Sequence, residues 1–340
     1  MFRVPISKTL ARPWVFPRLV LGLAVALAAC GGADGRTLAR RSPKAARWTA
    51  LVHASRPLDL VGPARSGSIV LAASGRLFLL TSGNRLTPYA AGYRSPGGEE
   101  PYIALSPGGC FGTGTVYALR LAHGRGVIAI DRAGRVRRLA AIGAPGLIDG
   151  IAFDTVGSFS HRLLVTINAG SRTTVDAIDC HGRVTVITRS APRLEGGIAV
   201  APRTFGQFGG FLIAPSETTG QIWAIAPTGR SALVANSALP HGGDIGVESE
   251  GFVPSGARDA LLADRLTPGN RHPGDDVVLR IGAAALAAAG VRPGDLLVAT
   301  EGGAMTDDVR CGSRGCAVRL VATGPSVAHA EGHIAFRSAG

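Results

Sequence analysis

Acidic side chains stand immediately before short apolar segments at several places along the sequence. They are Glu100, Asp149, Glu195, Glu250 and Glu331. If these segments are equivalent strands of a repeating fold, the five carboxylates converge on one point. Carboxylates that lie close together repel one another unless a cation or an arginine shares the site, and Ca²⁺ accepts an oxygen-only set of ligands. The pattern therefore indicates a site for Ca²⁺ or another divalent cation.

A purely structural interpretation of the same carboxylates remains open. Each one could accept hydrogen bonds from the backbone of its own turn, or pair with an arginine of a neighbouring unit. Glu217, Asp264 and Glu301 follow strands at a similar place in their units. They raise the same choice between a shared site and solvated loop positions.

The loop Pro240–Asp244 offers a second candidate for chemistry. It places His241 near Asp244, which is a possible arrangement for a general base in a wet pocket, although a loop histidine is often only polar surface. His333, beside Glu331, carries the same two interpretations. The sequence holds no Gly-x-Ser-x-Gly turn, no His-Glu-x-x-His and no phosphate-binding loop. Whether the protein is an enzyme is therefore left open.

The elements that must position these residues recur about every 47 to 48 residues. Each unit contains an apolar strand, a turn ending in Gly-Arg and a second strand, most clearly at 127–136, 175–184 and 222–230. A period of this length with several strands per unit predicts a β-propeller. The length of the chain predicts six four-stranded blades, with five or seven as alternatives. An Ala-rich stretch at 282–290 predicts one short helical insertion into this all-β fold.

The first thirty residues have the parts of an export signal. A basic region is followed by an apolar run that is too short to span a membrane, and the run ends in Leu27-Ala28-Ala29-Cys30. This motif resembles the bacterial lipobox, which implies a signal peptide at 1–29 and lipid attachment, such as palmitate, on Cys30. We expect a flexible tether over 30–47 and one propeller domain over 48–340, held outside the cytoplasm on the bacterial membrane.

Export implies an oxidising compartment, in which cysteines form disulfides. Cys311 and Cys316 flank a four-residue turn, so we expect a local bridge between them. Cys110 and Cys180 then form the second pair by elimination. A cysteine-based metal site would need a second close pair, which the spacing does not provide.

The formal net charge of +13 raises the question of nucleic-acid binding. The arginines are scattered, however, and nucleic-acid-binding proteins gather basic and aromatic residues on one face. We therefore expect no nucleic-acid partner. Membrane contact occurs through the lipid anchor, and we expect a monomer.

Short motifs in the repeats resemble the six-bladed propellers of the SMP-30/gluconolactonase and NHL-like group. The motifs are at 149–154, 195–200, 250–253 and 331–336. In the lactonases of that group Glu, Asn and Asp residues hold one divalent cation at the ring axis, and a carboxylate takes a proton from water. The asparagine ligands have no matching motif here, although Asn168 and Asn270 are present.

Two classes of function follow from these observations. The first is a membrane-anchored binding or scaffold propeller whose ring face holds a small molecule, a glycan or a partner protein, because the blade pattern comes without a matched catalytic set. The alternative is a divalent-metal-dependent hydrolase of lactones or esters, which the acidic positions and the resemblance imply. Propellers that use a quinone cofactor share the fold, but no residue set here points to one.

Overall fold

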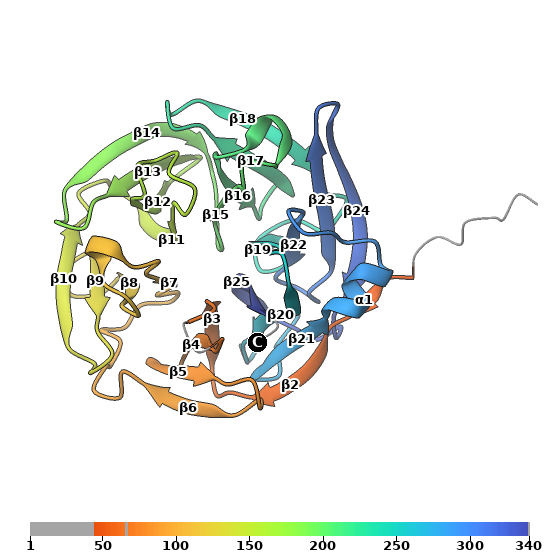
Figure 1. Ribbon diagram of the computed structural model, residues 1–340, viewed down its shortest axis with the longest axis horizontal. Helices are drawn as coiled ribbons and strands as arrows, with labels where there is room; N and C mark the ends of the chain where they lie inside the picture. Colours follow the sequence, from red (N-terminus) through yellow and green to blue (C-terminus); the bar gives the residue numbers. More distant parts are fainter. Residues whose placement is uncertain (1–43, 65–66, 339–340) are drawn as a thin grey trace, which may run out of the picture. The chain divides into compact units, whose positions relative to one another are not determined.

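The computed structural model describes residues 44–64 and 67–338, which belong to one compact unit, Pro43–Gly340. Within these residues the regular structure is almost entirely β, and the strands form sheets arranged around a common axis (Figure 1). The all-β propeller that the repeat predicts is confirmed. No helix in the described part of the chain is long and apolar enough to cross a membrane.

Four sheets contain four consecutive strands each, and the first strand of each lies nearest the axis (Figure 1). The first sheet has β3 (Pro57–Val61), β4 (Ile69–Ala73), β5 (Arg76–Leu80) and β6 (Leu86–Tyr89). The second has β7 (Ile103–Leu105), β8 (Val116–Arg120), β9 (Gly126–Ile130) and β10 (Val136–Ala141). The third has β11 (Leu147–Phe153), β12 (Leu163–Ala169), β13 (Arg172–Ile178) and β14 (Val184–Pro192). The fourth has β15 (Ala199–Val200), β16 (Leu212–Ser216), β17 (Gln221–Ile225) and β18 (Ser231–Asn236).

The remaining strands form one nine-stranded sheet with two halves. One half has β19 (Val247–Phe252), β22 (Leu296–Thr300), β23 (Thr306–Gly312), β24 (Gly315–Thr323) and β1 (Ala46–Arg47). The other has β25 (Ala330–Ser338), β20 (Ala257–Asp264), β21 (Val277–Gly282) and β2 (Thr49–His53). A parallel pair between β19 and β25, at Glu250 and His333, joins them. Counted separately, the halves bring the ring to six sheets, although the number of blades stays a prediction.

The order of strands in this sheet differs from the simple repeat. The chain leaves β19, forms β20 and β21 in the other half, and returns for β22 to β24. The apolar pattern marks each strand but not its partner, so the sequence could not reveal this exchange. The last strand, β25, is innermost in a half whose outermost strand is β2. The two ends of the folded chain therefore close one sheet together, with β20 and β21 between them.

The Gly-Arg turns form the outer hairpins of three successive sheets. In the β9–β10 turn Asp131 accepts the backbone N–H of Arg135 at 2.9 Å, and Asp179 does the same for Arg183 in the β13–β14 turn. The glycine of each turn has a positive φ, +82° at Gly134, which favours a residue without a side chain. The motif is thus a repeated turn structure.

Apolar side chains fill the spaces between neighbouring sheets. Between the second and third sheets, Phe111, Tyr117 and Phe153 pack edge to face with ring centroids 4.9 to 5.5 Å apart. Such contacts add to the stabilisation from apolar burial. Both faces of each sheet are therefore covered, and the inner strand edges are left to line the axis.

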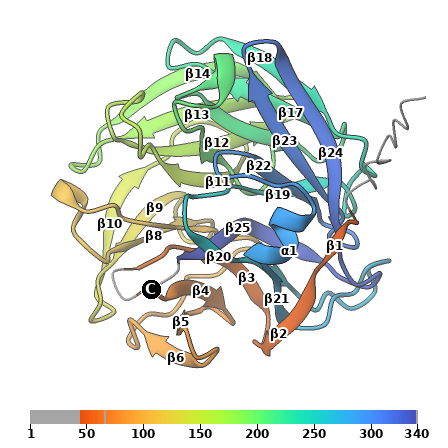
Figure 2. The same cartoon turned by 45° about the vertical axis from the view of Figure 1, so that its right-hand side comes forward.

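Both predicted disulfides are present. Cys110, in a short 3-10 turn, is bonded to Cys180 in the β13–β14 turn, and so connects the second and third sheets. Cys311 and Cys316 are directly opposite one another on β23 and β24. The predicted helical insertion is also confirmed as α1 (Ala283–Ala288), which packs beside β1 and β20 (Figure 2).

The expected export signal and the lipidated Cys30 lie outside the described residues. At the other end of the expected tether, β1 pairs with β24 through Ala46 and Ala322. The sheet therefore begins before the expected boundary at Trp48.

Candidate functional site

The pairing of β19 with β25 decides which acidic residues meet at one end of the central axis of the ring. We call this end the axial mouth. The two strands run parallel and pair Glu250 with His333, and the acids that precede this pair, Glu248 on β19 and Glu331 on β25, have carboxylate oxygens within 4.8 Å of one another. Glu250 lies two residues deeper. Glu248 thus takes the place that the sequence assigned to Glu250, and this corrects the expected set.

One group of carboxylates consists of Glu100, Glu248 and Glu331, each with an oxygen within 4.8 Å of the others. The buried Tyr102 hydroxyl lies 2.5 Å from Glu248 Oε1 and 3.0 Å from Glu331 Oε2. A phenol has a single proton to donate. Without a cation, one of the two carboxyl groups must therefore carry a proton to complete both contacts.

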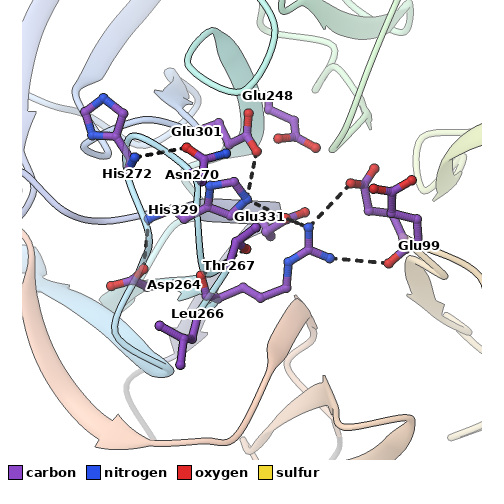
Figure 3. A network of polar contacts seen from close by, with 12 residues as sticks. Glu99, Glu248, Asp264, Leu266, Thr267, Asn270, His272, Glu301, His329 and Glu331 are labelled. Carbon is purple, nitrogen blue, oxygen red and sulfur yellow. Dashed lines mark hydrogen bonds and ion pairs between the residues drawn. The ribbon is translucent and has the colours of Figure 1, made fainter.

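A second group shares Glu331 and adds Glu301 and His329 (Figure 3). His329 Nε2 lies 2.9 Å from Glu301 Oε1 and 3.2 Å from Glu331 Oε1. All three side chains are buried. The His329 imidazole therefore contacts two carboxylates in a place that water hardly reaches.

Arg265 is the arginine that contacts these groups. Its Nη2 lies 2.5 Å from Glu331 Oε1 and 3.7 Å from Glu100 Oε1. Its Nη1 donates to the backbone carbonyl of Glu99 at 3.3 Å. One guanidinium and one imidazolium thus face five glutamates, the fifth being Glu217 beside Glu301, so positive charge falls short by three.

The shortage of positive charge favours protonated carboxyl groups. Burial, and then the neighbouring Glu331, raise the pKa of Glu100 to about 9. Burial, and then Glu301, raise the pKa of Glu217 to about 8. Burial also raises the pKa of Glu248. For His329 burial opposes the charged form, but the carboxylates of Glu301 and Glu331 outweigh it and raise the pKa to about 10.

Two of the expected acids have their own structural partners. Asp149 is buried, accepts the N–H of Gly196 at 3.3 Å and contacts the Asn168 amide. Glu195 accepts from Arg193 Nε at 2.8 Å. The contacts of these two residues agree with the structural interpretation, in which each carboxylate has its own partner within the protein. Asn168 thus lies beside a carboxylate of the mouth.

Glu250 occupies a different part of the axis. It is among the residues that line a chamber of about 370 Å³, whose walls come mainly from the apolar inner strands. Glu250 is fully buried, and neither of its carboxylate oxygens has a hydrogen-bond partner among the described residues. At the same level, His333 Nδ1 lies 2.9 Å from Asp59. Of the five expected acids, only Glu100 and Glu331 belong to the two groups.

The other sequence candidates are divided between the mouth and the surface. His241 and Asp244 are exposed on their loop, outside both groups. Asp264 is buried and accepts the backbone N–H of His329 at 2.9 Å, so it holds the segment that carries the imidazole (Figure 3). Asn270 accepts the His272 N–H at 2.9 Å in the nearby loop.

The sequence analysis did not assign His329, Tyr102 or Glu248 to the site. A signal existed for His329, because residues two apart in an extended segment share one side and His329 is two positions before Glu331. The contact of Tyr102 with β19 and β25 joins segments far apart in the sequence, which no local pattern predicts.

No protein-family model matches the sequence, and no curated protein matches it. Among solved structures, the calcium-binding protein regucalcin from Agrobacterium tumefaciens is 12% identical with a TM-score of 0.51, over 86% of this chain and 83% of its own. Streptogramin B lyase is 10% identical with a TM-score of 0.48, over 88% and 96%. Virginiamycin B lyase from Staphylococcus aureus is 12% identical with a TM-score of 0.43, over 78% and 85%. The likeness to regucalcin supports the β-propeller fold.

Proposed function

We propose that the protein is a divalent-cation-dependent hydrolase of lactone or ester bonds. The observation that carries this proposal is the excess of buried carboxylates at the axial mouth. Five glutamates face one guanidinium and one imidazolium, and a buried charge without a partner is costly. A divalent cation would remove most of the remaining imbalance.

The residues present fit such a cation. His329 Nδ1 is buried without a hydrogen-bond partner among the described residues, and Glu331 Oε1 and His329 Nε2 are engaged only in the ion pairs with Arg265 and Glu301 and with each other. Glu100, Glu248 and Glu331 form an oxygen-only set of the kind that Ca²⁺ accepts. The set with His329 suits a transition metal better. We favour Ca²⁺, and the related fold described as calcium-binding regucalcin agrees with this choice.

A bound cation would polarise the carbonyl oxygen of a substrate. The remaining roles belong to the chain. Tyr102 holds Glu248 and Glu331 in place through its hydroxyl. Glu217 is partly exposed, and its pKa of about 8 lies near neutral pH, as a group that accepts and returns a proton requires. We assign proton transfer at the scissile bond to the Glu217 carboxyl.

The first experiment measures cation binding and turnover on the same preparation. We expect Ca²⁺ to raise the melting temperature of chelator-treated protein and to restore hydrolysis in a screen of lactones and esters. Glu331→Gln removes a ligand common to both groups and should abolish both effects. Glu195→Gln is the matched control, because Glu195 is at the same mouth but is paired with Arg193.

The outcomes separate the functional classes. Cation binding without turnover on any lactone or ester would contradict the hydrolase and favour the binding or scaffold function that the sequence also predicts. No bound metal by mass and no change in melting temperature with Ca²⁺, Mn²⁺ or Zn²⁺ would contradict the cation site itself.

We further propose that Cys30 carries the lipid that anchors the protein, outside the cytoplasm, to the bacterial cell membrane. The support is the Leu-Ala-Ala-Cys motif after the apolar run. Cys30→Ser is expected to abolish labelling by a palmitate analogue and release the protein from the membrane fraction. Unchanged labelling of this variant would contradict the proposal.

A further inference from the structure

A second cavity, of about 290 Å³, lies between the first sheet and the segment that leads to β7. Its walls include the β4–β5 turn at 74–75 and six of the residues between Tyr93 and Pro101. Arg265, which pairs with Glu331 at the axial mouth, also lines this cavity. The cavity is therefore next to the candidate metal centre. Its size approaches that of pockets that hold small ligands.

Three arginines line the cavity, namely Arg56, Arg76 and Arg265. Arg56 and Arg76 are exposed, and neither guanidinium forms an ion pair with any residue that the structure describes. Arg265 Nε is buried and has no acceptor within the described ranges. The cavity thus offers several guanidinium N–H groups that have no protein partner.

This arrangement differs from that of other exposed arginines in the protein. Arg135 Nε lies 2.6 Å from Asp131, and Arg183 Nε lies 3.1 Å from Asp179. Those side chains form part of a turn. Arg56 and Arg76 come from separate segments and meet at the cavity, so no turn structure explains them.

One carboxylate opposes the arginines. Glu99 lines the cavity, but it is exposed, and it is its backbone carbonyl that contacts Arg265 Nη1, at 3.3 Å. The wall therefore contains three arginines and one glutamate. If Glu331 neutralises the charge of Arg265, the two positive charges of Arg56 and Arg76 still exceed the single negative charge of Glu99.

We infer that this cavity binds the oxyanion group of a small organic anion, either a carboxylate or a phosphate. Guanidinium groups present paired N–H donors that match the oxygens of both anions. Arg56 and Arg76 bind the anion from the outer wall, and Arg265 contributes the Nε–H at the inner wall. The inference of anion binding is independent of catalysis.

A consequence for substrate choice rests on the proposed function. An ester or lactone with an anionic group would have that group in the arginine cavity while its carbonyl reaches the neighbouring axial mouth. Arg265 lies between the two places and shields the bound anion from Glu100 and Glu331. The preferred substrates would then be acidic ones.

Calorimetric titration of the purified protein with inorganic phosphate and, separately, with malonate tests the inference. The titrations are run with chelator and again with Ca²⁺. We expect at least one anion to bind, and the tighter one identifies the ligand class. Arg56→Gln and Arg76→Gln are each expected to weaken binding about tenfold. Arg138→Gln, an exposed arginine on β10, is the matched control and should leave the affinity unchanged.

The inference is overturned if neither anion binds in either condition, or if the double variant Arg56→Gln/Arg76→Gln binds as well as the unaltered protein. Both side chains are exposed, so melting temperatures should confirm that the variants fold. If hydrolysis is found, the double variant should raise KM for an anionic ester and leave that for a neutral ester unchanged. Failure to find any hydrolysis would contradict the proposed function without affecting the calorimetric result.

Discussion

Raising the pH of the cation-free protein should lower its melting temperature, because the folded state holds protons that the unfolded state releases. The pKa of Glu100 rises from 4.5 to about 9 on folding, and that of Glu217 from 4.5 to about 8. The stability that these groups contribute is complete below their unfolded pKa and is lost as pH rises toward the folded pKa. His329, raised from 6.5 to about 10, acts in the same direction.

The smallest expected change in the free energy of unfolding is the one that the proton of Glu100 alone contributes. A fully shifted group changes the free energy of unfolding by about 1.4 kcal/mol for each pH unit. Because the Glu100 side chain is 26% exposed, we halve this value for solvent screening to about 0.7 kcal/mol. From about pH 6 to about pH 8 the loss is then about 1.4 kcal/mol, or about 2 °C in melting temperature for a domain of this size.

Thermal unfolding followed by circular dichroism in chelator measures this slope. Saturating Ca²⁺ should flatten it, because the cation replaces the protons. Glu331→Gln should also reduce the slope, whereas Glu195→Gln should preserve it. A melting temperature that is constant or rises between these pH values in chelator would refute the reasoning.

Three further predictions concern the folded scaffold. Cys110→Ser should lower the free energy of unfolding by about 4 kcal/mol and Cys311→Ser by about 2 kcal/mol, since the closed loops span 70 and 5 residues; denaturant titration under oxidising conditions measures both. Glu250→Gln should not lower stability, because burial raises the pKa of this carboxyl and opposes its charged form, which the amide cannot adopt; a lower denaturation midpoint would contradict this. Arg337→Met should cost about 2 kcal/mol, because the buried Asp259 loses a partner at 2.6 Å but keeps Arg280 at 2.7 Å, and an unchanged denaturation midpoint would contradict this.

Much of the fold could be predicted because its signals are local. The Gly-Arg copies at 127–136, 175–184 and 222–230 coincide with the β9–β10, β13–β14 and β17–β18 hairpins. The disulfides and α1 were equally visible from spacing and composition. The partner strands of β20 and β21 could not be predicted, because the apolar pattern of two consecutive strands does not indicate which sheet they join.

The site was harder to predict for a related reason. Glu248 and Glu250 are two positions apart on one strand, and the register of that strand shifts between Val247 and Ser249. Their sequence context cannot decide which one stands at the mouth. The Glu-Gly motif favoured Glu250, but the pairing of Glu250 with His333 places Glu248 beside Glu331. Strand register, which depends on distant residues, decided the outcome.

The nine-stranded sheet also bears on how the protein is made. β25 supplies Glu331 and is the last strand along the chain, yet it pairs with β19 and β20 and faces the axis. Until β25 has been synthesised, the edges of β19 and β20 that it pairs with have no partner strand. The two carboxylate groups cannot form either, because both contain Glu331. Contacts of such long sequence separation slow folding. The candidate site can therefore assemble only after β25 has been synthesised, and a premature stop before β25 would leave an open ring exposed to aggregation and proteolysis.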